Sequence, residues 1–222
     1  MTREKITLSA ALILAAIAAT IASAADSVPA QRAWSDGLYA TARLIGDDGR
    51  CQYPASCVIV GQSDDTAIAV ACAHQARTET SWTIWPIGHS AYPATLIYRS
   101  NFDQSPTWSA DIAVFRFQPA GPVHVAQLAD CSPGAGTPVE IRGYPLGSAQ
   151  QQGKPRTVRS VRGSCLTLHG PAQQGDSGGA VLDRTTGNLV GILSSTGQTE
   201  SIATDVRAVR EVLGRYCSGE YG

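Results

Sequence analysis

The segment Gly175-Asp176-Ser177-Gly178-Gly179 has the composition of a turn that presents a nucleophile. Glycine reaches backbone angles closed to other residues and lets a substrate approach the main chain closely. A tight turn here would lift the Ser177 hydroxyl into a cleft. It would also direct the N–H groups of Gly175 and Ser177 at one point, where an oxyanion would form. Because an ordinary glycine-rich β-turn fits these five residues equally well, the assignment depends on partners elsewhere in the chain.

A serine nucleophile needs a base, usually histidine, and an acid that fixes the tautomer of that histidine. The four histidines all precede Ser177 in the chain: His74, His89, His124 and His169. This order argues against an α/β-hydrolase, whose Gly-x-Ser-x-Gly motif is followed by the histidine rather than preceded by it. The alternation of strands and helices that this fold needs is missing as well.

His74 and Asp111 are the best candidates for the base and the acid. His74 ends the apolar run 66–73, a predicted strand that would carry it to the rim of a sheet, although a lone histidine there is often structural. Asp111 directly precedes the apolar run 112–117, where a buried carboxylate is costly unless it is paired. An aspartate that merely opens a strand is the alternative. The order His–Asp–Ser predicts a cleft between two subdomains.

Short runs rich in Val, Ile, Thr and aromatic residues, separated by Gly, Pro and Asp, predict an all-β fold. We expect strands over 38–45, 57–60, 66–72, 82–87, 94–98, 112–117, 139–143, 157–161, 165–168, 180–183 and 189–193. Two clusters of about six strands indicate two small barrels or sandwiches packed together. Only the tail is expected to be helical, with Ser201 or Thr204 as its cap and Gly214 at its end.

The first 24 residues are typical of a signal peptide. A charged start precedes an apolar run over 6–21, and Ala22-Ser23-Ala24 predicts cleavage before Ala25. An uncleaved membrane anchor is the alternative, but the run is short for a span. We therefore expect a secreted or periplasmic protein without membrane contact after cleavage. The expected organisation is 1–24 signal peptide, 25–35 N-terminal segment, 36–120 first barrel, 121–203 second barrel and 204–217 helix.

Composition narrows the classes of partner. The chain has 17 Lys and Arg against 18 Asp and Glu, and this balance argues against binding to nucleic acid or to anionic membrane. No Cys/His cluster has zinc-site spacing, so neither a metal nor another cofactor is expected. The six cysteines allow 15 complete pairings, and an oxidising compartment would favour disulfides. Cys72, in an apolar strand, fits equally well as a core residue.

Five ordered motifs carry a resemblance to the trypsin/chymotrypsin-like serine proteases. The Gly-Asp-Ser-Gly-Gly segment resembles the nucleophile motif of that family, and Asp111-Ile-Ala-Val114 is similar to its Asp-Ile-Ala-Leu. Ala71-Cys-Ala-His74 resembles its Ala-Ala-His and the Cys-Ala-His of its bacterial branches. Two further matches are Gly143-Tyr-Pro-Leu-Gly147 and Val190-Gly-Ile-Leu-Ser194. The resemblance spans about residues 36–217, and five motifs in order are far more specific than one.

The resemblance implies two six-stranded antiparallel β-barrels with a C-terminal helix and a catalytic site between the barrels. Ser177 would attack a peptide or ester carbonyl, His74 would take its proton, and Asp111 would orient His74. The N–H groups of Gly175 and Ser177 would bind the oxyanion. The implied protein is a secreted, monomeric serine endopeptidase acting on proteins or peptides. A catalytically silent binding module is the alternative, although such a protein would be expected to have lost one of the three residues.

The sequence differs from the digestive members of the family at the positions that govern their specificity and their activation. Those members are activated by a cut before Ile-Val-Gly-Gly, which is absent between residues 25 and 38, so the partner of Asp176 stays open. Pro171 stands where trypsin-like enzymes carry the aspartate that selects Lys or Arg, so we expect a small or apolar residue before the scissile bond. Pro171 and the segment Ser194-Ser195-Thr196 are predicted to bind the substrate, the latter through its main chain.

The resemblance also bears on the cysteines. Gln75 follows the candidate histidine, where the family has a cysteine, so the family disulfide beside the histidine is not carried over. Cys131 and Cys217 resemble a family bridge between the linker and the final helix. Pairing of Cys51 with Cys57 or Cys165 remains open.

Overall fold

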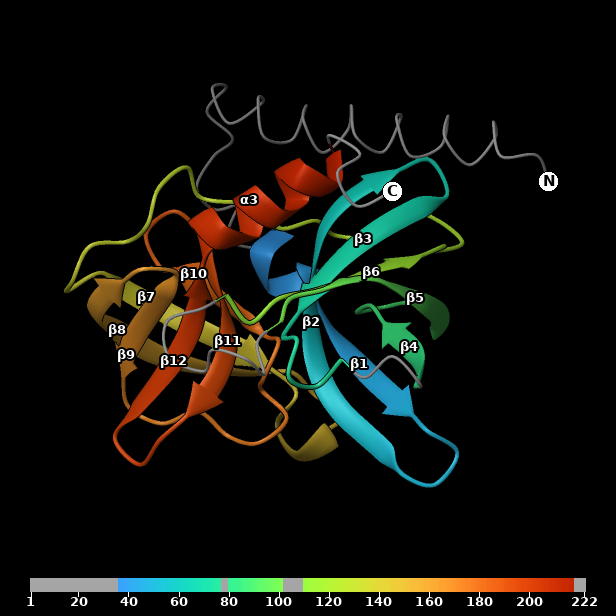
Figure 1. Cartoon of the computed structure of the whole chain (residues 1–222), viewed down its shortest axis with the longest axis horizontal. Helices are drawn as coiled ribbons and strands as arrows, with labels where there is room; N and C mark the ends of the chain where they lie inside the picture. The colour runs from blue at the N-terminus through green and yellow to red at the C-terminus, as the bar shows by residue number, and fades with distance from the viewer. Residues whose placement is uncertain (1–35, 77–79, 102–109, 218–222) are drawn as a thin grey trace.

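The computed structural model describes residues 36–76, 80–101 and 110–217, and the side chains of 216 and 217 are not described. The predicted signal peptide (1–24) and N-terminal segment (25–35) therefore lie outside the described residues. The described residues form two closed six-stranded antiparallel barrels and a C-terminal helix, and residues 36–40 are helical although a strand was predicted over 38–45 (Figure 1). The predicted fold class is confirmed. No helix in these described ranges is long and apolar enough to cross a bilayer.

The first barrel closes in the order β1-β2-β3-β6-β5-β4. Its strands are β1 (Thr41–Asp47), β2 (Gln52–Ser63), β3 (Thr66–Ala71), β4 (Ser81–Trp85), β5 (Tyr92–Arg99) and β6 (Ala113–Phe117). Strand β3 is apolar on both faces because Ala67 and Ala69 point into the barrel, whereas Ile68 and Val70 pack towards the second barrel. Side chains alternate between the two faces of a strand, so a strand buried on both sides shows no polar alternation.

The second barrel closes in the order β10-β11-β12-β9-β8-β7. Its strands are β7 (Pro138–Gly143), β8 (Gln152–Arg162), β9 (Cys165–His169), β10 (Ala180–Asp183), β11 (Leu189–Thr196) and β12 (Glu200–Asp205), with a short 3₁₀ helix, η3 (Pro145–Gly147), between β7 and β8. Strand β12 was missing from the predicted strands, because a short segment with alternating polar residues carries a weak signal. It pairs with β11 and β9.

The C-terminal helix α3 (Val206–Cys217) begins later than its predicted caps. Ser201 and Thr204 lie within β12. Asp205 provides the cap instead, since its Oδ1 accepts the N–H of Arg207 at 2.7 Å. Gly214 was predicted to end the helix, but it lies inside it.

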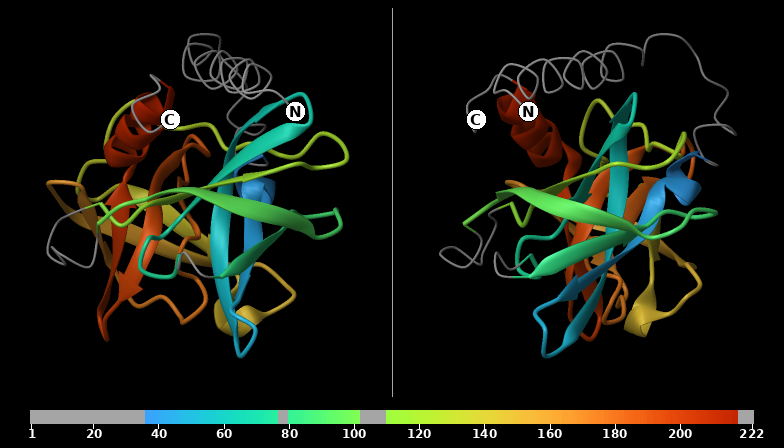
Figure 2. Two further views of the ribbon diagram at one scale, coloured as in Figure 1. Left: turned by 45° about the vertical axis from the view of Figure 1, so that its right-hand side comes forward. Right: turned by 90° about the vertical axis from the view of Figure 1, so that its right-hand side faces the viewer.

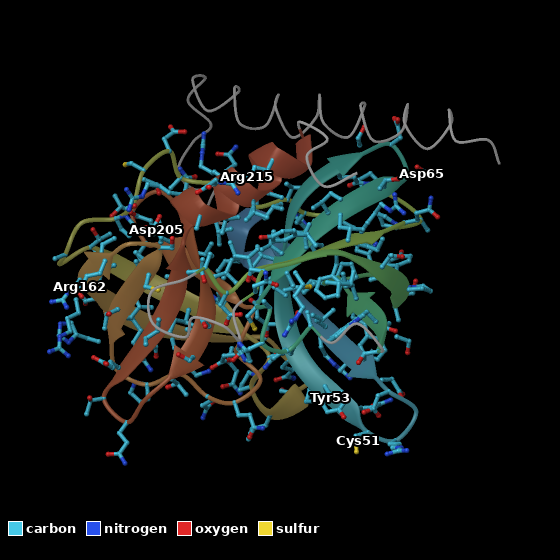
Figure 3. All side chains as sticks on the ribbon, viewed as in Figure 1. Cys51, Tyr53, Asp65, Arg162, Asp205 and Arg215 are labelled. Carbon is cyan, nitrogen blue, oxygen red and sulfur yellow. The ribbon has the colours of Figure 1, made fainter. Side chains whose placement is uncertain are left out.

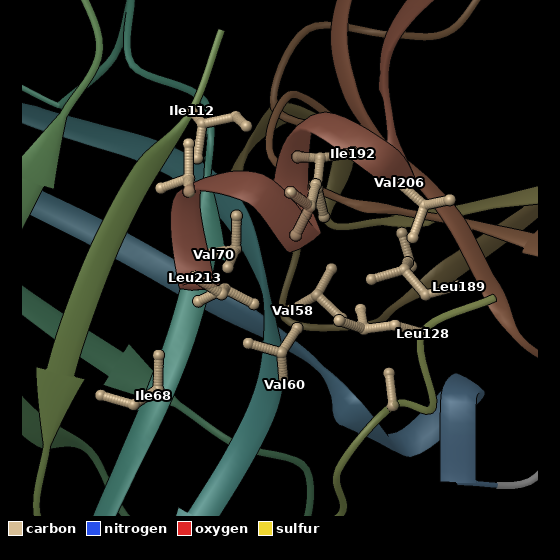
Figure 4. Close-up of a cluster of buried hydrophobic side chains, with 14 of the residues drawn as sticks. Val58, Val60, Ile68, Val70, Ile112, Leu128, Leu189, Ile192, Val206 and Leu213 are labelled. Carbon is tan, nitrogen blue, oxygen red and sulfur yellow. The ribbon is translucent and has the colours of Figure 1, made fainter. Parts of the chain in front are cut away.

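An apolar core joins the barrels and α3. Figure 4 shows Val58 and Val70 of the first barrel facing Leu189 and Ile192 of the second, with Leu213 of α3 beside them. Two further directions of view show the same side-by-side arrangement (Figure 2). Because this core is continuous and apolar, the barrels pack closely against each other, and a site divided between them keeps a fixed geometry.

Candidate active site

His74 and Asp111 are brought together by the pairing of β3 with β6. His74 follows the end of β3 and Asp111 precedes β6, and the two strands pair through Ala71 and Ala113. The Nδ1 atom of His74 lies 2.6 Å from Oδ2 of Asp111, and the main-chain N–H of His74 donates to Oδ1 at 2.9 Å. The carboxylate therefore fixes both the ring and the backbone of His74. Asp111 is buried, whereas the His74 side chain is 32% exposed.

The second barrel also holds Asp111. The hydroxyl of Ser194 donates to Oδ2 at 2.5 Å, and the main-chain N–H of Asp111 donates to Oγ1 of Thr204 at 3.1 Å. Burial by itself would raise the pKa of Asp111, but the hydrogen bond and charge of His74, with the hydrogen bonds from Ser194 and from the His74 amide, bring the pKa below its ordinary value of 3.8. An ionised Asp111 accepts only, so Nδ1 of His74 carries a proton and Nε2 is left as the acceptor in the neutral ring.

The turn around Ser177 leaves two of its backbone donors unused among the described residues. The N–H of Gly178 donates to Leu193 O (2.7 Å) and that of Gly179 to Asp176 O (2.8 Å). The N–H groups of Gly175 and Ser177 donate to no group in the described part of the chain.

The direction of these two donors follows from the planarity of the peptide bond. The carbonyl of Gln174 accepts from the N–H of Leu146 at 2.7 Å, and that of Asp176 accepts from Gly179. In a trans peptide the C=O and the following N–H point in opposite directions. The N–H groups of Gly175 and Ser177 therefore point away from the contacts that anchor the turn, as an oxyanion site requires.

Strand β2 of the first barrel supports the nucleophile turn. The main-chain N–H of Ser56 donates to Ser177 O, and its hydroxyl donates to Gly175 O, both at 2.9 Å. A Cβ atom on Gly178, where φ is 84°, would lie 1.9 Å from the carbonyl oxygen of Ser56. Only glycine fits there. The sequence analysis missed Ser56. The only indication in the sequence is that a polar residue stands within an apolar strand.

Asp176 has a partner within the chain. Its side chain is fully buried, and its Oδ2 lies 2.6 Å from Nζ of Lys154 and accepts the N–H of Gln173 at 2.9 Å. Gly143 leaves room for this carboxylate, since a Cβ there would lie 2.7 Å from Oδ1 of Asp176. Lys154 was also missed, although it is the only lysine in the sequence after Lys5.

The hydroxyl of Ser177 donates to the carbonyl oxygen of Ser194 at 3.1 Å and not to His74 in the described residues. Such looseness between nucleophile and base is common without substrate. Of the predicted substrate-binding residues, Ser195, Thr196 and Pro171 are exposed. Ser194 is buried, and its hydroxyl contacts Asp111.

Thr196 joins the two segments that were predicted to bind the substrate. Its Oγ1 accepts the N–H of Ala172 at 2.9 Å, which ties the end of β11 to the segment that contains Pro171. The other three histidines lie outside the His74–Asp111 pair. Nδ1 of His124 lies 3.3 Å from Oδ1 of Asp36, the ring of His89 contacts that of Tyr92, and His169 is exposed at the end of β9.

One group near the site has metal-like spacing. Ligand atoms of Cys72, His74 and Asp111 lie within 4.8 Å of one another, and the Sγ atom of Cys72 is 3.9 Å from Nε2 of His74. Burial, with a smaller contribution from the charge of Asp111, raises the pKa of the Cys72 thiol well above its ordinary value. A thiol that resists ionisation and a carboxylate already engaged by His74 fit a hydrogen-bonded histidine better than a metal centre.

The structure tests some of the cysteine predictions and leaves another untested. Cys51 is exposed and bonds to neither Cys57 nor Cys165, so both alternatives for it were wrong. Cys57 lies in β2, is buried and faces the first barrel's interior, whereas Cys51 precedes the start of β2, six residues earlier, which is roughly 20 Å at the rise of a strand. Cys131 is exposed, and the side chain of Cys217 lies outside the described residues, so their pairing stays a prediction.

Comparison with known proteins identifies the family of the chain. Residues 55–192, more than half of the chain, match the model of the trypsin-like peptidase domain. The chain belongs to this family and is thus a serine endopeptidase, a hydrolase of proteins or peptides. No curated protein sequence matches it.

Solved structures share the fold. A serine endoprotease from Yersinia pestis is 18% identical, with a TM-score of 0.72 over 88% of this chain and 69% of that chain. The active form of the Rv3671c protease from M. tuberculosis is 17% identical, with a TM-score of 0.68 over 86% of this chain and 88% of that chain. At such identities the likeness concerns the fold alone.

Proposed function

We propose that this trypsin-like serine peptidase cleaves peptide bonds with Ser177 as nucleophile, His74 as general base and acid, and Asp111 as the group that orients His74. One observation carries the proposal above the others. The two unused N–H groups, of Gly175 and Ser177, flank the serine hydroxyl, and the His74–Asp111 pair stands on the facing barrel.

The reaction would proceed through an acyl-enzyme. The Ser177 hydroxyl turns from the carbonyl of Ser194 to His74, and Oγ attacks the substrate carbonyl carbon while Nε2 takes its proton. The oxyanion is bound by the N–H groups of Gly175 and Ser177. The C–N bond then breaks as His74 returns the proton to the leaving amine. Water, deprotonated by His74, hydrolyses the ester to the acid and regenerates Ser177.

Lys154 makes a cut at the N-terminus unnecessary for this site. In the digestive members a new terminal amine pairs with the acid beside the serine. Here the ammonium of Lys154 occupies that position from within β8, at 2.6 Å from Asp176. The turn that carries the oxyanion donors is therefore held in place by the folded chain itself.

The location of the enzyme is a further part of the proposal. The apolar run over 6–21 and the Ala-Ser-Ala sequence support export and cleavage before Ala25, which would place a monomeric enzyme in the periplasm or outside the cell. N-terminal sequencing of the protein recovered from an exporting host checks this. A start at Met1 in all fractions would overturn it.

The activity is tested with a fluorophosphonate probe read by intact mass. We expect stoichiometric labelling of the purified protein and none of the Ser177→Ala variant. Because the probe needs only an activated serine and an oxyanion site, no substrate has to be known. A folded wild-type protein that is not labelled would refute the proposal and favour the silent binding module.

A further inference from the structure

A cavity of about 400 Å³ lies beside His74 and Gly175 and is lined from both barrels. Strand β2 contributes Tyr53 and Pro54, and η3 contributes Leu146. Figure 3 shows Tyr53 near the end of β2 that leads to the hairpin carrying Cys51. None of the described residues that line the cavity is Asp, Glu, Lys or Arg. Gln75 and Gln174 also line the cavity, but most of its exposed surface is apolar, so it favours an apolar occupant.

Leu146 is held at the rim of this cavity in an unfavourable way. The residue is 75% exposed, and its backbone is left-handed, with φ 53° and ψ 26°. Residues other than Gly, Asn and Asp seldom adopt this region because of its steric cost. The conformation is kept by the hydrogen bond from the Leu146 N–H to Gln174 O and by the packing of Gly147 against Pro54. Strain that presents an exposed leucine beside a catalytic site points to a role in function.

The reaction geometry decides which part of a substrate reaches this cavity. The cavity is lined by His74, which protonates the leaving amine, and by Gly175, but by none of the residues of β11. The acyl half of the substrate lies along the exposed Ser195 and Thr196 of β11. The residues after the scissile bond therefore lie on the side of His74 and Gly175, next to Leu146.

We propose that this cavity, named here the Leu146 pocket, binds an apolar side chain from the first two residues of the leaving peptide. The ring of Tyr53 forms one wall, fixed by the hydrogen bond from its hydroxyl to Oδ2 of Asp48 at 2.5 Å. Pro54 and Leu146 supply the other apolar contacts. Leu146 is thus a specificity-determining residue, and the inference rests on the proposed function.

Transfer of the acyl group to an added amine tests the binding of residues after the scissile bond separately from the binding of the acyl half. An ester substrate forms the acyl-enzyme without any leaving-side residue, and an added amine then competes with water. The amine nitrogen bonds to the acyl carbon as the bond to Ser177 Oγ breaks, and His74 passes the proton of the amine to Oγ. Leucinamide, glycinamide and glycyl-leucinamide are compared by the ratio of transfer to hydrolysis, which needs no correction for the amount of active enzyme.

We expect leucine at one of the two positions to raise this ratio roughly tenfold over glycine, as one apolar side chain in a pocket commonly does. Leu146→Asn keeps a residue that tolerates the left-handed backbone and should reduce the preference about fivefold or more. Leu146→Gly, which also accepts this backbone, is the second variant in case the first does not fold. The matched control is Tyr39→Ser, because Tyr39 is the other large apolar residue exposed in the described ranges and does not line the cavity.

The outcomes separate this inference from the proposed function. Ester hydrolysis with no preference for leucine at either position, or with a preference that both Leu146 variants retain, would overturn the inference alone. A protein that forms no acyl-enzyme would overturn both. A preference lost in the Leu146 variants and kept in Tyr39→Ser supports the Leu146 pocket.

Discussion

Replacement of Lys154 by methionine tests whether the buried ion pair with Asp176 holds the oxyanion donors in place. Methionine keeps most of the volume and removes the charge 2.6 Å from Oδ2 of Asp176. The Asp176 carboxylate is fully buried, and its Oδ1 has no hydrogen-bond partner in the described structure, so Lys154 is its main source of compensation. Removing one partner of a buried pair costs about 3–5 kcal/mol.

The cost falls on the segment next to the active site. Asp176 lies between Gly175 and Ser177, so a carboxylate that turns towards water moves both oxyanion donors. If all of the lost free energy appears as a rearrangement of this turn, kcat/KM falls roughly 10²- to 10⁴-fold, since about 1.4 kcal/mol corresponds to a factor of ten. If part of the lost free energy lowers the stability of the whole fold, the thermal midpoint of unfolding falls as well.

The assay is the rate of fluorophosphonate labelling, together with kcat/KM on a peptide and the thermal midpoint. Arg159→Met is the matched control, because Arg159 also lies on β8 but pairs with Glu200 at the surface, with 56% of its side chain exposed. Such a pair contributes at most about 1 kcal/mol, and we expect labelling at the wild-type rate. In the double variant Lys154→Met with Asp176→Asn, stability should recover towards wild type because no charge remains buried. A Lys154→Met protein labelled at the wild-type rate would refute this reasoning.

Three further predictions follow from single contacts. Gly178→Ala should give no stable, active protein, because the new Cβ would lie 1.9 Å from the carbonyl oxygen of Ser56. Gly214 has open space around it on α3, so Gly214→Ala should raise the free energy of unfolding by up to about 1 kcal/mol. Thermal unfolding of both variants checks these expectations. Because the pKa of Asp111 is lowered on folding, the ionised carboxylate stabilises the folded state above pH 3.8, and this stabilisation is lost as the pH falls through the lowered pKa. The difference in the free energy of unfolding between wild type and Asp111→Asn should therefore shrink on acidification. A difference that grows would contradict the direction of the shift. Exposed Cys51 should react rapidly with a thiol reagent in the native state, and the fast phase should lose one equivalent of thiol in Cys51→Ser but none in Cys57→Ser, since burial raises the pKa of the Cys57 thiol.

The fold class was accessible from sequence because it depends on local signals. Apolar runs of strand length, separated by turn residues, are repeated along the chain whatever their final partners are. Residues 38–40, predicted as the start of a strand, are helical. Strand β12, which was missing from the predicted strands, shows the limit of such signals. Its six residues form a strand because β11 and β9 flank them, and the same contacts displaced the start of α3 to Val206.

The sequence by itself determined the candidate triad, because Ser177, His74 and Asp111 each lie in a motif a few residues long. Only the tertiary structure decided what surrounds them. Lys154 is 22 residues from Asp176, and Ser56 is 119 residues from the carbonyl of Gly175 that it contacts. Such partners carry no local pattern, because their contacts arise from the closure of each barrel and from the packing of one barrel against the other.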